Sequence, residues 1–139
     1  MSIADSVPAP ALKTTRTPIF PIALVAGLVA IAGSFGPWST ITGAKVSGME
    51  GDGSITLGIA IFAGLLVLVV GMSSRRPRFG AHWFALIAAA LVPAIAIIDM
   101  ADIGSSASGW GIWAVAVGGI VLTLACLLLA AGAMKRPKR

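Results

Sequence analysis

Residues 111–134 read GIWAVAVGGIVLTLACLLLAAGAM, an apolar run of 24 residues that contains no charged side chain. A helix needs about 20 apolar residues to cross the hydrocarbon core of a bilayer, so this run is long enough to span a membrane. The run lacks the alternation of polar and apolar residues of a barrel strand, whereas a helix satisfies its own backbone groups in lipid. We therefore predict a transmembrane helix over residues 111–134.

Three more apolar runs precede it, and none contains Lys, Arg or Glu; they cover about residues 19–35, 55–72 and 81–98. Of all 139 residues, 58% are hydrophobic and 11% are charged, whereas a soluble domain carries about 25% charged residues. A soluble chain this short must keep much of its surface polar, so the composition excludes an ordinary soluble enzyme or nucleic-acid-binding domain. The predicted fold is an all-α membrane protein, with a four-helix transmembrane bundle over residues 18–134 between a polar tail (1–17) and a basic tail (135–139).

The basic residues predict the orientation of this bundle. Nine of the ten Lys and Arg residues lie in the two tails and in the link between the second and third runs. The link between the first and second runs holds only Lys45, and the link between the third and fourth runs holds none. Positive charge stays on the cytoplasmic side of a membrane. We therefore expect both termini to be cytoplasmic and the loop around Lys45 to face outward.

The four tryptophans all fall near the ends of the runs. Trp38, Trp110 and Trp113 lie at the predicted outer interface, and Trp83 lies at the inner one. Indole rings prefer the headgroup level of a bilayer. We expect all four side chains to be interfacial anchors.

The loop after the first run contains the most distinctive pattern of the chain. It can fold as a short β-hairpin that turns at Gly43-Ala44, and either Asp52 or Ser54 can cap the helix that follows. The pattern Pro37-Trp38, Gly51-Asp52-Gly53 and Thr56-Leu57 resembles a group of small actinobacterial four-span membrane proteins of unassigned function. The resemblance covers about residues 20–72 and implies a protein of the bacterial plasma membrane.

Small residues recur at four-residue spacing within the runs, and Gly27, Gly64, Gly118 and Gly119 are the clearest examples. Such rows let helix backbones approach closely, either inside the bundle or against a partner. Pro93 lies inside the third run, where we expect it to kink the helix, as a packing feature or as a gating hinge.

Two acidic residues stand at the outer end of the third run. Asp99 and Asp102 are three residues apart and can share a helix face. Lys45 is the only basic residue expected on that side of the membrane. Four readings stay open for these residues: solvated charges, an ion pair with Lys45, contact with a partner, or a cation site.

The rest of the chain offers no pattern for chemistry. The sequence has one His and one Cys, and neither a catalytic triad nor a metal-ligand cluster nor a phosphate-binding glycine loop can be recognised. His82 has no evident second ligand, and Cys126 reads as a small apolar packing residue. We therefore predict no enzyme activity, no catalytic residue, no metal and no cofactor, and no nucleic acid or specific small molecule as a partner.

The function that remains is a non-catalytic accessory or structural subunit bound to larger integral membrane proteins. Proteins of this size class can act as accessory subunits of envelope complexes, such as Mce-type lipid-import and respiratory machines, and by this analogy we favour transport over respiration. The alternatives are a small homo-oligomeric transporter or channel, and a holin. Membrane lipids are a further expected partner, because the tail at 135–139 can contact anionic headgroups.

Overall fold

The computed structural model describes residues 18–41, 43–72, 79–104 and 107–134. The predicted tails and the basic link around Arg76 lie outside the described residues. The elements are α1 (Ile19–Phe35), β1 (Pro37–Ile41), β2 (Ala44–Ser47), the short 3-10 helix η1 (Gly48–Glu50), α2 (Gly53–Met72), α3 (Phe79–Ile103) and α4 (Trp110–Met134).

Three of these helices, α2, α3 and α4, are long and apolar enough to cross a membrane. This finding supports the predicted class of helical membrane protein. Helix α1 is equally apolar but has only 17 residues, so it covers about 25 Å, against about 30 Å of hydrocarbon in a typical bilayer. Helix α3 continues past the predicted end at residue 98 and stops before Gly104, whose φ of +84° suits a glycine that follows a helix.

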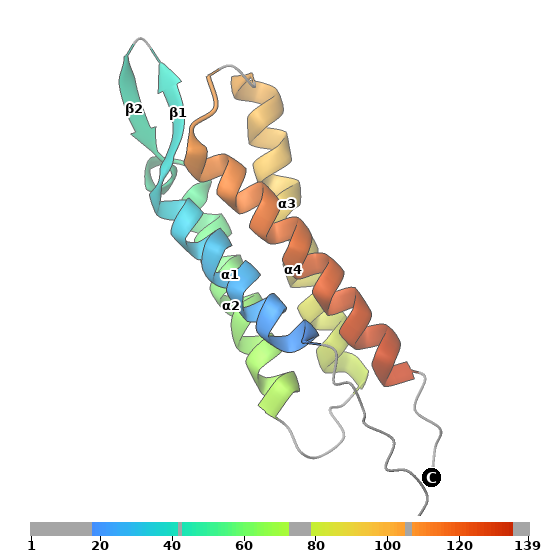
Figure 1. Cartoon of the computed structure of the whole chain (residues 1–139). Coiled ribbons are helices and arrows are strands. Elements are labelled where there is room, and N and C mark those ends of the chain that lie inside the picture. The colour runs from blue at the N-terminus through green and yellow to red at the C-terminus, as the bar shows by residue number, and fades with distance from the viewer. Residues whose placement is uncertain (1–17, 42, 73–78, 105–106, 135–139) are drawn as a thin grey trace, which may run out of the picture.

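The four helices form a bundle in which each helix contacts the next one in chain order, and α4 closes the ring against α1 (Figure 1). The hairpin lies at one end of the bundle, beside the end of α3 and the start of α4. We call this the hairpin end. The start of α1 and the end of α4 lie at the opposite end, which we call the tail end.

Small residues bring α4 close to both of its neighbours. A Cβ atom added to Gly33 of α1 would lie 2.7 Å from the carbonyl oxygen of Gly111, and one added to Gly118 would lie 2.9 Å from that of Ala26. Gly119 faces the other side, where an added Cβ would lie 2.7 Å from Cδ of Pro93 on α3. Gly118 and Gly119 therefore serve packing inside the bundle, where backbones in close contact gain dispersion energy.

Gly27 and Gly64 differ from this pair. An added Cβ would meet nothing within 4 Å at either position, apart from the helix's own backbone and neighbours. Neither glycine is needed for a close approach within the chain.

The predicted hairpin is confirmed. Strand β1 pairs antiparallel with β2 in the register Thr40↔Lys45 and Ile41↔Ala44, and Gly43 in the turn has a φ of +83°, which glycine adopts without strain. The free edge of β1 bonds to the loop before α4: Thr40 N–H donates to the carbonyl of Ala107 at 2.9 Å. The hairpin and the loop before α4 are thereby joined into one unit at the hairpin end, which we call the hairpin cap.

Candidate functional site

An open pocket of about 240 Å³ lies under the hairpin, between η1, the start of α2 and the end of α3. Four carboxylates line it: Glu50, Asp52, Asp99 and Asp102. These are four of the five acidic residues of the chain. We call this the acidic pocket, and it is our candidate functional site.

Trp38 forms one wall of the acidic pocket and corrects a prediction. It was expected at the membrane interface, but only 4% of its surface is exposed. Its Nε1–H donates to the carbonyl of Gly33 at 3.2 Å, at the end of α1, and this carbonyl also accepts the N–H of Gly36 at 3.1 Å. The indole ring packs on Gly48, whose missing side chain leaves room for it. A buried tryptophan that satisfies its N–H in this way is a structural residue and not a lipid anchor.

The other three tryptophans lie on the outside of the bundle. Trp110 and Trp113 are exposed at the start of α4, and Trp83 is exposed near the start of α3. They therefore stand near opposite ends of the bundle, where interfacial side chains would be needed if the helices cross a bilayer.

Backbone contacts hold Asp52 in the pocket. Its carbonyl oxygen accepts hydrogen bonds from both the N–H and the Oγ1–H of Thr56, each at 2.9 Å. Ser54, the other predicted cap, donates its Oγ–H to the carbonyl of Gly51 at 3.2 Å. The first turn of α2 is thus tied back to the loop, and the Asp52 side chain is left to face α3.

The Asp99 carboxyl group meets Asp52 from the opposite wall. The two side chains lie within hydrogen-bonding reach, and Asp102 adds a further negative charge nearby. The Oδ2 atom of Asp99 is buried and has no hydrogen-bond partner. The pocket therefore gathers four acidic groups, of which Glu50, Asp52 and Asp102 are exposed and Asp99 is half-buried. A buried carboxyl oxygen without a partner is costly, and a cation would satisfy it.

Lys45 does not supply that cation. It is exposed on β2, it does not line the acidic pocket, and no ion pair joins it to Asp99 or Asp102. Its neighbour Val46 does line the pocket, and successive side chains of a strand point to opposite faces. The hypothesis of an ion pair between Lys45 and Asp99 or Asp102 is therefore not supported.

The arrangement suits a cationic group better than a bound metal ion. Among the residues that the structure describes, no group of three or more His, Cys, Asp or Glu side chains is placed to hold a metal. A guanidinium or ammonium group needs only one or two carboxylates within reach, and it forms strong charge-assisted hydrogen bonds with them. A pocket of this size admits such a side chain.

Comparison with protein-family models, with curated proteins and with solved structures finds no match for this chain. The actinobacterial resemblance therefore stays a prediction.

The structure nevertheless gives a physical reason for the pattern behind the resemblance. A Cβ on Gly53 would collide with the backbone of Gly48, and one on Gly109 would collide with that of Pro37. Two residues of the pattern, Pro37 and Gly53, thus take part in the close backbone contacts of the hairpin cap. The local sequence does not mark Glu50, Gly48 or Gly109 as site residues; only their position in the loops next to the pattern points to them.

Proposed function

We propose that the protein is a non-catalytic accessory subunit of a larger complex in a bacterial plasma membrane, and that the acidic pocket receives a basic side chain of the partner. One observation carries the proposal: among the residues that the structure describes, four acidic residues line one pocket and no Lys or Arg does. Asp52 and Asp102 both repel the ionised form of Asp99, so a cation from outside would relieve the repulsion. A hydrogen bond to a charged group contributes about 1.5–3 kcal/mol, which makes such a contact effective.

The proposed orientation has four crossings and places both termini in the cytoplasm. The distribution of basic residues supports it, since the hairpin end carries Lys45 alone among the Lys and Arg residues. Exposed Trp110 and Trp113 at that end support an outer interface at the start of α4. The short α1 is compatible with a crossing, because about 17 residues is the lower limit for a transmembrane helix.

The sides of the bundle suit lipid or partner helices. Large apolar side chains are exposed along all four helices, for example Leu28, Phe62, Phe84 and Leu124. The acidic pocket sits at the rim of this apolar surface, so a partner in the same membrane can use both. Among host complexes we favour Mce-type lipid import over a respiratory complex, by analogy of size and topology alone.

The test is affinity purification of the full-length tagged chain in mild detergent, followed by mass spectrometry. We expect larger membrane proteins to co-purify, and we expect the double variant Asp99→Asn with Asp102→Asn to lose them while it stays in the membrane. Lys45→Gln is the matched control, since it removes a charge at the same end but outside the pocket. Recovery of the chain without larger partners would contradict the subunit role. Equal recovery of partners with the pocket variant would remove the pocket from the contact.

A further inference from the structure

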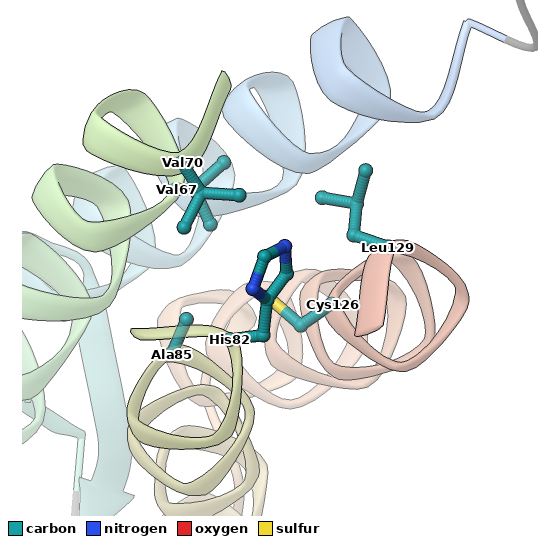
Figure 2. A pocket seen from close by; sticks show the side chains of 6 residues that line it. All are labelled: Val67, Val70, His82, Ala85, Cys126 and Leu129. Atoms are coloured by element: carbon teal, nitrogen blue, oxygen red, sulfur yellow. The ribbon is translucent and has the colours of Figure 1, made fainter. Parts of the chain in front are cut away.

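A second, much smaller cavity lies toward the tail end, between α2, α3 and α4. Its volume is about 10 Å³, and Val67, Val70, His82, Ala85, Cys126 and Leu129 line it (Figure 2). A space of this size holds a single small occupant.

His82 is the unusual member of this lining. Only 6% of its surface is exposed, and its Nδ1 atom is buried without a hydrogen-bond partner. A buried polar atom left unsatisfied costs about 1–3 kcal/mol. The ring stands between Val67 and Val70 of α2 and the chain of α4 that carries Cys126.

Cys126 is the only other group in the lining that can bind a ligand through its side chain. It is 2% exposed, and its thiol is free. The remaining four side chains are aliphatic. A thiol and an imidazole therefore share one mainly aliphatic cavity that admits a single small occupant.

We propose that this cavity binds one Cu(I) ion between His82 and Cys126. Thiolate sulfur is a soft ligand that selects Cu(I), and imidazole also suits copper. Zinc requires about four ligands, and no third His, Cys, Asp or Glu of the described chain completes such a set.

Charge balance separates Cu(I) from divalent ions. On binding, the S–H bond of Cys126 breaks, a sulfur–copper bond forms, and the proton leaves to solvent; copper stays in the Cu(I) state. The thiolate and the monovalent ion cancel, and neutral His82 adds a lone pair, so the cavity gains no net charge. A divalent ion would leave one positive charge in apolar surroundings, which is strongly unfavourable.

The proposal does not depend on the proposed function, because the cavity lies away from the hairpin end. We would titrate the full chain in detergent with Cu(I) under anaerobic conditions, against a chromophoric Cu(I) chelator. We expect one ion per chain and the release of one proton. Cys126→Ala and His82→Phe, which remove each ligand with small changes of volume, should each weaken binding by more than about tenfold. Met72→Leu, which removes an exposed thioether at the tail end, is the control and should bind like the unmodified chain.

A measurement on the unmodified protein guards against variants that fail to fold. X-ray absorption of the copper-loaded chain should show one sulfur and one nitrogen neighbour, and the ¹⁵N resonances of His82 should shift on loading. The proposal is overturned if no copper is retained above a detergent blank, or if a folded Cys126→Ala variant retains it unchanged. Copper neighbours without both sulfur and nitrogen would overturn it as well.

Discussion

The hydroxyl of Thr123 on α4 lies 3.0 Å from the carbonyl oxygen of Ala89 on α3, and this is the carbonyl that Pro93 deprives of its helical donor. Proline has no N–H, so residue 89 loses the hydrogen bond that position 93 would normally give it. The same hydroxyl lies 2.7 Å from the carbonyl of Gly119, one turn back on its own helix. Its single hydrogen is therefore shared between the two helices.

This relationship explains how α3 keeps a proline in its interior. Gly119 leaves room for the ring of Pro93, and Thr123, four residues on, supplies the missing donor. Helix α3 is continuous from Phe79 to Ile103 across the proline. These contacts support the interpretation of Pro93 as a packing feature.

We predict that Thr123→Val destabilises the protein by about 0.5–1.5 kcal/mol, the range of interhelical hydrogen bonds in membranes. Pro93→Ala restores an N–H for Ala89, so in this background Thr123→Val should cost clearly less. A double-mutant cycle on the free energy of unfolding in detergent measures the coupling. Thr123→Ser keeps the hydroxyl and serves as the control. Additive effects of the two substitutions would show that the hydroxyl does not serve the freed carbonyl.

The second prediction compares Gly118, which packs closely against another helix, with Gly27, where an added Cβ meets nothing within 4 Å. Gly118→Ala should destabilise the bundle by about 1–3 kcal/mol, because the new Cβ would lie 2.9 Å from backbone atoms of α1. Gly27→Ala is the matched control on α1; its Cβ meets nothing within 4 Å, so helix propensity should make it neutral or slightly stabilising. Thermal unfolding of the two variants in the same detergent measures the difference. Equal stability of the two variants would contradict the close contact between α1 and α4.

The same comparison makes Gly64 the informative position for a partner, because it is only half-buried and an added Cβ meets nothing within 4 Å. Leucine at this position should leave the bundle folded and inserted. Loss of co-purifying proteins in Gly64→Leu would then report a contact outside the chain. Retention of all partners would restrict the contact to other surfaces.

Hydropathy was sufficient to predict the helices, and it failed where the chain folds back on itself. The apolar runs mark α2 and α4 within a few residues, because lipid-facing and buried positions are both apolar. The end of α3 was missed, since Asp99 ends the apolar run but does not end the helix; Gly104 does. The burial of Trp38 depends on Gly48 returning to the end of α1, a contact that no local pattern encodes.

The acidic pocket was predictable only in part for the same reason. Asp99 and Asp102 stand out as acidic residues at the end of an apolar run, and their spacing suggests one helix face. Asp52 and Glu50 reach them only because the hairpin folds over the end of α3. The same limit hid the cavity that His82 and Cys126 both line, since each lies on a different helix and neither has a ligand-type residue nearby in sequence.

The third prediction concerns Trp38 in the hairpin cap. Trp38→Phe keeps an aromatic ring but removes one of the two N–H groups that donate to the carbonyl of Gly33, so we expect a loss of about 1 kcal/mol. Trp110→Phe is the control, because Trp110 is 61% exposed and should change stability by less than about 0.5 kcal/mol. Chemical denaturation in detergent measures both. A loss of similar size in both variants would show that Trp38 contributes no more to stability than an exposed tryptophan does.

The fourth prediction is topological. A cysteine introduced at Gly43, in the exposed hairpin turn, should react with a membrane-impermeant thiol reagent added to intact cells. A cysteine added after Arg139 should react only once the membrane is opened. Cys126 is buried and should contribute little labelling. Labelling of the C-terminal cysteine in intact cells would contradict the four-span orientation with cytoplasmic termini.

The last prediction separates a subunit from a small transporter. Between the helices, several small apolar side chains are fully buried: Ala30, Ala60, Ala63, Ala89, Val92 and Ala96. The buried polar side chains Ser34, Thr56 and His82 lie near the ends of their helices. A transporter needs polar groups at depth to hold or move its substrate, whereas the carboxylates of this chain gather at one end. The purified protein in liposomes should therefore move neither ions nor cationic dyes above the rate of empty liposomes. The reconstituted Asp99→Asn variant is the control, and it should behave in the same way. Robust flux through the unmodified protein that Asp99→Asn abolishes would reject the subunit role, because the acidic pocket would then be the mouth of a transport path.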